Sequence, residues 1–141
     1  MKRDSAIRGG CFCASVRYEL EGSLQNARAC HCSRCRKAFS GASSAYAELS
    51  PSSSLEWLSG EDLLTVFETG EGWGMAFCSK CGSTICGLHD GQVHGLTLGC
   101  IDGDPGVEIA MHIFVDSKAA WDQIGGDAKQ FAEHGPQVHE V

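Results

Sequence analysis

Apolar and polar residues alternate along several short stretches of the chain, as they do in β-strands with one buried face. Val16, Tyr18 and Leu20 alternate with the charged residues Arg17 and Glu19. Such stretches are bounded by Gly, Asp and Ser, which favour turns. The pattern therefore predicts a chain rich in short strands. The stretches lie at 16–20, 64–67, 73–77 and 107–115.

Signals for helices are few. An Asp-Ser pair could cap a short helix over Lys118–Ile124, which Gly125 and Gly126 would stop. A second short helix is expected over Asp127–Glu133, and one helical turn is expected after Cys32. We expect these helices to lie at the edges of the fold.

The composition agrees with a small β-rich domain. The chain has 141 residues, which is enough for one hydrophobic core and short for two. Its 18 glycines indicate many tight turns. We therefore predict a mainly β fold in which residues 1–141 form a single domain, with Trp73 and Trp121 as packing anchors.

Charge is distributed unevenly along the chain. Residues 1–40 carry a net charge of +5 and residues 41–141 carry −12, which gives −7 in total. A net acidic chain is a poor candidate for a general nucleic-acid binder. The first eight residues lack an apolar signal region, and no stretch approaches the length of a membrane span. We therefore expect a cytoplasmic protein with reduced thiols and no membrane partner.

The nine cysteines are the strongest chemical signal, and four of them form two complementary pairs. Cys11 and Cys13 precede a predicted strand, where residues i and i+2 point to the same face. Cys78 and Cys81 flank a predicted tight turn, and Gly82 would relieve the positive-φ strain that such a turn imposes. Four thiolates can form a closed tetrahedral site, so we predict a structural zinc held by these cysteines.

A third group contains Cys30, Cys32 and Cys35, which can wrap one ion from a single loop. Two tetrahedral ions need eight ligands, whereas the clustered cysteines number seven. The free position could take water or substrate, as in catalytic zinc sites. Alternatively, a histidine, Cys86 or Cys100 closes this site and makes it a second structural staple.

The remaining cysteines and histidines have less specific interpretations. Cys86 and Cys100 stand alone in apolar, strand-like segments and are predicted to be buried structural thiols. His31 lies between two candidate ligands and is expected to point outward. His112 lies in an apolar stretch, which is more typical of a core histidine than of a metal ligand.

Four motifs together resemble the glutathione-dependent formaldehyde-activating (GFA) family, which includes the domain of centromere protein V. The resemblance spans residues 9 to about 131, and the order and spacing of the motifs make it specific. Ala14 departs from it, since the family usually has Gly after the second cysteine, and Ala120 replaces a common Pro. The motifs are GGCFC at 9–13, CHCSRCRK at 30–37, FCSKCGS at 77–83 and HIFVDSKAAW at 112–121.

The resemblance implies a fold of several coiled antiparallel β-sheets stapled by zinc. It assigns one zinc to four cysteines and a second zinc to three, which is the partition already indicated by spacing. It also implies a carbon–sulfur lyase or S-hydroxymethylglutathione synthase activity, with glutathione as co-substrate. The implied ligand sets are Cys11, Cys13, Cys78 and Cys81 for the first zinc, and Cys30, Cys32 and Cys35 for the second.

The expected chemistry joins a small thiol to an aldehyde. A thiol is a poor nucleophile until it loses its proton, and coordination to zinc promotes that loss. The thiolate would then attack the carbonyl and give an S-hydroxymethyl adduct. Glutathione is anionic, so Arg34, Arg36 and Lys37 could hold its carboxylates. Alternatively, these cations merely offset the thiolate charge.

Two other functions remain open at this stage. Both zincs could be structural, which would make the chain a non-catalytic interaction module without an evident general base. A redox role for Cys78 and Cys81 is disfavoured, since Cys11 and Cys13 offer that pair a metal-binding partner. The ligand set of the second metal would distinguish the enzyme from the module.

Overall fold

The computed structural model describes residues 6–135. The chain divides into two compact units. The first comprises the residues up to Gln25 together with Ala47–Val107, and the second comprises Asn26–Tyr46 together with the residues from Glu108 onward. Within residues 6–135, no helix has the length and apolar character needed to cross a membrane. The fold is mainly β, as the alternation predicts.

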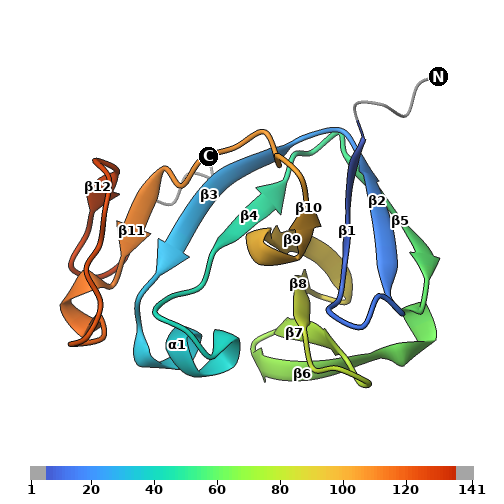
Figure 1. Cartoon of the computed structure of the whole chain (residues 1–141), viewed down its shortest axis with the longest axis horizontal. Coiled ribbons are helices and arrows are strands. Elements are labelled where there is room, and N and C mark those ends of the chain that lie inside the picture. The colour runs from blue at the N-terminus through green and yellow to red at the C-terminus, as the bar shows by residue number, and fades with distance from the viewer. Residues whose placement is uncertain (1–5, 136–141) are drawn as a thin grey trace. The chain divides into compact units, whose positions relative to one another are not determined.

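The elements are short and follow one another closely along the chain (Figure 1). Most strands are joined by tight turns, and there is one α-helix within the described range. The strands are β1 Ile7–Gly10, β2 Arg17–Glu21, β3 Leu24–Cys30, β4 Tyr46–Leu49, β5 Ser54–Ser59, β6 Leu64–Gly70, β7 Trp73–Cys78, β8 Thr84–His89, β9 Gln92–Thr97, β10 Ile101–Asp102, β11 Met111–Ile113 and β12 Lys129–Gln130. The helices are α1 Ser33–Phe39 and the 3-10 turns Glu61–Leu63, Leu98–Cys100 and Val115–Ser117.

A four-stranded antiparallel sheet, ordered β10-β1-β2-β5, forms one part of the first unit. Figure 1 shows β1, β2 and β5 side by side. Tyr18 and Leu20 are fully buried on β2, as their alternation predicts. Tyr18 contacts Trp57 of β5 edge to face, with ring centroids 5.9 Å apart. Glu19 is also buried, and the Arg8 side chain donates a 2.9 Å hydrogen bond to its carboxylate.

The other part of the first unit is the antiparallel run β9-β8-β7-β6, with β4 next to β9. The sequence predicts that Trp73 packs into the core from β7, but it is 37% exposed. Ala76 and Cys78, on the opposite face of β7, are the buried residues instead. The phase of this strand is therefore the reverse of the prediction, because the face that carries Cys78 is the one turned inward.

In the second unit, β11 lies between β3 and β12 and runs parallel to both. The predicted helix at Lys118–Ile124 is absent, and only a 3-10 turn, Val115–Ser117, precedes it. The predicted helix at Asp127–Glu133 is also wrong, since β12 occupies its centre and pairs with β11. Trp121 is 73% exposed and is not a packing anchor.

The helical turn expected after Cys32 is confirmed as α1. The long apolar stretch at 107–115 forms a strand only at β11. The chain divides into two compact units, and the interpretation of residues 1–141 as a single domain stays a prediction.

Candidate functional site

Two turns of the first unit bring four cysteines together. Cys11 follows β1, and Cys13 lies in the turn that leads into β2. Cys78 ends β7, and Cys81 lies in the turn before β8. Their sulfur atoms all lie within 4.8 Å of one another. We call this group, which matches the pairing expected from the sequence, the four-cysteine cluster.

Backbone hydrogen bonds shape both turns. The Cys11 amide donates to the Val16 carbonyl at 3.1 Å, and the Gly82 amide donates to the Cys78 carbonyl at 2.7 Å. Gly82 has a φ of +83°, as the sequence predicts for this turn. Ala14 has a φ of +68°, a left-handed conformation that favours glycine.

Neighbouring polar groups favour the thiolate form at the exposed side of this cluster. Hydrogen bonds from Ser83 lower the pKa of the Cys81 thiol to about 5. Hydrogen bonds from Ser15 lower the pKa of Cys13. Burial instead raises the pKa of Cys78. The Val16 amide also points at the Cys11 sulfur, 3.3 Å away.

The geometry of the four-cysteine cluster fits tetrahedral zinc. Four sulfurs at the usual zinc–sulfur bond length would lie about 3.8 Å apart. The sulfurs of Cys11 and Cys13 are 3.6 Å apart, and those of Cys13 and Cys78 are 3.9 Å apart. Both distances agree with tetrahedral zinc, and all four sulfurs lie within 4.8 Å of one another although they come from turns far apart in the sequence.

The second unit gathers Cys30, Cys32 and Cys35 at the junction of β3 and α1. Cys30 ends β3, Cys32 caps the helix, and Cys35 lies in its first turn. The Cys35 amide donates to the Cys32 sulfur at 3.3 Å, in the manner of a serine or threonine cap. The three sulfurs lie within 4.8 Å of one another. We call this group the three-cysteine cluster.

A buried serine fixes the start of this loop. The Cys30 amide donates to the Ser44 hydroxyl at 3.1 Å, and the Ser44 amide donates to the Cys30 carbonyl at 3.0 Å. Hydrogen bonding from Cys30 lowers the pKa of Cys35 to about 6, with further help from Cys32 and Ser44. The same contact with Cys35, together with burial, raises the pKa of Cys30. The cluster thus holds one thiol poised to ionise first.

The three-cysteine cluster gains no fourth protein ligand within residues 6–135. Neither a histidine nor a carboxylate joins the group, and Cys86 and Cys100 also lie outside it. Cys86 is buried on β8, and burial raises its pKa to about 12. Cys100 is only half-buried and lies in a 3-10 turn, whereas the sequence predicts a strand.

His31 is buried, although the sequence predicts that it points outward. It is 2% exposed, and its ring contacts that of His112 on β11. The Nε2 atom of His31 and the Nδ1 atom of His112 are hydrogen-bonded at 2.9 Å. Burial lowers the pKa of His31. Sequence reasoning missed this pair because its members are 81 positions apart.

The three predicted anion-binding residues all lie on α1 but differ in exposure. Arg34 and Lys37 are exposed, whereas Arg36 is half-buried. The Arg36 amide donates to the Cys32 carbonyl at 3.0 Å, which places Arg36 one helical turn after Cys32. The helix therefore brings cationic side chains next to the three-cysteine cluster.

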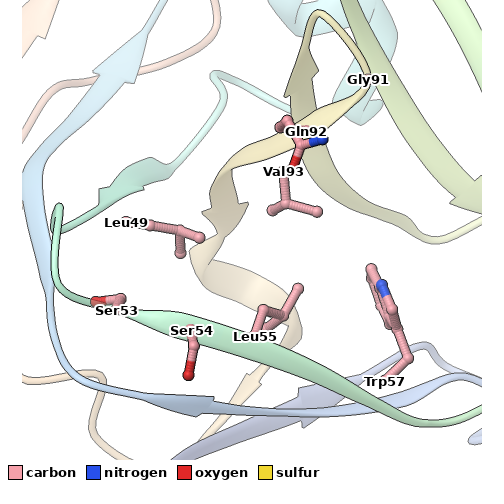
Figure 2. A pocket seen from close by; sticks show the side chains of 8 residues that line it. All are labelled: Leu49, Ser53, Ser54, Leu55, Trp57, Gly91, Gln92 and Val93. Carbon is pink, nitrogen blue, oxygen red and sulfur yellow. The ribbon is translucent and has the colours of Figure 1, made fainter.

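A hollow of about 400 Å³ also lies in the first unit. Figure 2 shows Leu49, Leu55 and Val93 pointing toward it, with Trp57 beside them. Its lining contains no metal-ligating or titratable side chain. The Ser53 hydroxyl on its rim is already hydrogen-bonded to Ser23 and Ser50. The hollow thus offers none of the chemistry found at the cysteine clusters.

Comparison with known families agrees with this geometry. Residues 6–117 match the family described as glutathione-dependent formaldehyde-activating enzyme. The chain belongs to this family. The match includes both cysteine clusters of the GFA chain and all of α1.

A crystal structure of a Rhodobacter sphaeroides protein resembles this GFA chain. The two share 29% sequence identity with a TM-score of 0.50, over 70% of this chain and 91% of that one. Among curated proteins, none matches the sequence significantly.

Proposed function

We propose that this GFA protein is a zinc-dependent carbon–sulfur lyase that forms or cleaves adducts between a small thiol and an aldehyde. The observation that carries the proposal is the three-cysteine cluster, whose described surroundings supply no fourth ligand. A metal site with three protein ligands leaves room for a substrate, whereas a structural site is closed. Glutathione and formaldehyde are the substrates that the family description suggests.

The sulfur donors of Cys30, Cys32 and Cys35 suit zinc, which prefers thiolate and imidazole ligands. When bound there, zinc would supply Lewis acidity that favours the thiolate form of a substrate thiol. In the forward reaction, one carbon–sulfur bond forms at the aldehyde carbon. The carbonyl π bond breaks, and the proton lost by the thiol ends on the new hydroxyl oxygen. The reverse reaction returns thiol and aldehyde.

The chain itself supplies the positioning. Ser44 holds Cys30 through two hydrogen bonds, and the Cys35 amide orients the Cys32 sulfur. Because these contacts involve buried or half-buried groups, the three sulfurs are held close together before any ligand arrives. The basic residues Arg34, Arg36 and Lys37 supply positive charge for the carboxylates of glutathione.

The four-cysteine cluster has a structural role in this proposal. Its closed ligand set leaves no position for a substrate. It joins the turn after β1 to the turn after β7, which lie about 65 residues apart. A zinc ion held there would staple the first unit, and the complete protein would carry two zinc ions. Small-molecule partners and a reducing, cytoplasmic setting complete the proposal.

The test measures how fast glutathione and formaldehyde exchange with their adduct. Exchange NMR on zinc-loaded protein should show acceleration above the uncatalysed rate. Cys35→Ser should abolish the acceleration and remove one zinc. Cys100→Ser, at a cysteine outside both clusters, should keep the acceleration and the full zinc content. A wild-type protein with two zinc ions and no acceleration would favour the alternative, a non-catalytic module with two structural zincs.

A further inference from the structure

Arg36 differs from the two other cations of α1 in one atomic detail. Arg34 and Lys37 are exposed, so water can solvate their charges. Arg36 is half-buried, and its Nε atom is fully buried without a hydrogen-bond partner among the described residues. The chain thus withdraws one guanidinium N–H from water and offers it no acceptor.

Such an arrangement is unfavourable in the absence of a ligand. A buried donor without an acceptor loses its hydrogen bonds to water and gains nothing in return. Arginine is seldom buried unless it is paired. Its Nε and one Nη atom form a planar fork that matches the two oxygens of a carboxylate. The unpartnered Nε of Arg36 is therefore a binding position for an anion with that geometry.

The helix places Arg36 one turn after the three-cysteine cluster's Cys32. Arg36 lies four residues after Cys32, so the two share a face of the helix. Side chains on a helix lean toward its N-terminus, and the N-terminus of α1 is where Cys32 and Cys35 lie. A molecule with its sulfur at the cluster would thus present its other end to Arg36.

We propose that Arg36 binds a carboxylate of the thiol substrate and thereby restricts the site to thiols that carry one. This inference rests on the proposed function, because it assumes that the thiol occupies the three-cysteine cluster. It separates Arg36 from its neighbours, since Arg34 and Lys37 contribute only solvent-screened attraction. Glutathione belongs to this class, and so do simpler mercapto acids.

The test compares three probes of similar size on the zinc-loaded protein by chemical-shift titration. These are 3-mercaptopropionate, its uncharged analogue 3-mercaptopropionamide, and 3-(methylthio)propionate, which keeps the carboxylate but has no free thiol. The wild type should bind the mercapto acid roughly 10- to 100-fold more tightly than the amide, as expected for a charge-assisted pair. Arg36→Gln should remove this preference and leave zinc content and amide affinity unchanged.

Two further variants separate recognition from general charge. Arg34→Gln removes one exposed cation from the same helix and should keep most of the preference. Arg36→Lys keeps the charge but loses the planar fork, so it should restore only part of the preference. If Arg34→Gln and Arg36→Gln act equally, or if Arg36→Gln lowers zinc content instead, Arg36 is not the carboxylate site.

The probes also distinguish the failure of this inference from the failure of the proposed function. If the wild type binds the acid and the amide equally, Arg36 recognition is wrong and the thiol site stands. If the mercapto acid binds no more tightly than 3-(methylthio)propionate, and Arg36→Gln weakens both, the carboxylate site stands and the proposed thiol site fails. If no probe binds, both are overturned.

Discussion

The ring of His31 is hydrogen-bonded to the ring of His112, with 2.9 Å between Nε2 and Nδ1. His31 lies between two sulfur donors of the three-cysteine cluster, and His112 belongs to β11. The His31 amide also donates to the Ile113 carbonyl at 3.0 Å. Two contacts therefore tie the cysteine loop to a strand that follows it by some 80 residues.

Replacing His112 should loosen this loop. His112→Ala leaves His31 buried with neither ring nitrogen bonded, since Nδ1 already lacks a partner. A buried polar group that loses its hydrogen bond costs about 1–3 kcal/mol, so the free energy of unfolding should fall by that order. Denaturant titration measures it. The matched variant His89→Ala removes a half-exposed histidine and should cost less.

The same variant should also release metal from the neighbouring loop more readily. A chelator titration of His112→Ala should remove zinc from the three-cysteine cluster at a lower chelator concentration than in wild type. The four-cysteine cluster, whose donors all belong to the first unit, should keep its metal. Equal release from both clusters would show that His112 acts on overall stability instead.

The four-cysteine cluster should control the stability of the first unit. Cys81→Ser removes one of four donors from a site that connects distant turns. Structural zinc provides on the order of 10 kcal/mol in small peptides, much of which appears as folding energy. We expect two zinc ions per wild-type chain by elemental analysis and a steep loss of thermal stability in Cys81→Ser. If the variant melts at the same temperature as the wild type, this cluster does not have the structural role proposed for it.

Ala14 offers a stabilising substitution. Its φ of +68° is left-handed, which costs an L-residue with a Cβ roughly 1–2 kcal/mol. Ala14→Gly removes that strain but increases the freedom of the unfolded chain, so we expect a net gain of about 0.5–1 kcal/mol. Ala38→Gly in α1 is the matched control and should destabilise, because its position is helical.

Of the two cysteines outside the clusters, Cys86 should react more slowly with alkylating reagents than Cys100. It is 1% exposed, and burial raises its pKa to about 12, so the thiolate is scarce at pH 8. Cys100 is more accessible. Iodoacetamide labelling followed by mass spectrometry should therefore modify Cys100 first. The rate at Cys86 should rise with pH, because the thiolate form grows as the pH approaches that pKa.

The sequence predicts the features that depend on local geometry. The turn that joins Cys78 and Cys81 is of this kind, with Gly82 at positive φ. Cys11 and Cys13 come together as predicted, although they lie in the turn after β1 and not in an extended segment. The helical turn after Cys32 is likewise local. Burial of Tyr18 follows from period-2 alternation. The strand content as a whole was predictable for the same reason.

The features that the sequence misses depend on partners far along the chain. The sequence predicts a short helix over Asp127–Glu133, but pairing with β11 makes residues 129–130 a strand. The face of β7 is set by the inward position of Cys78, not by the bulkier Trp73. The burial of His31 depends on His112, which no local pattern could identify. Local propensity is a weak guide where tertiary pairing competes.

The order of the cysteines along the chain also sets an order of assembly during translation. The donors of the three-cysteine cluster are complete once residue 35 has left the ribosome, whereas the four-cysteine cluster waits for Cys81. At ~5–20 residues/s this interval lasts a few seconds. During it, Cys11 and Cys13 are two donors of an unfinished site, while all three donors of the other cluster are present. The nascent chain thus meets the cellular zinc supply first at the loop proposed for chemistry and last at the staple that holds the first unit together.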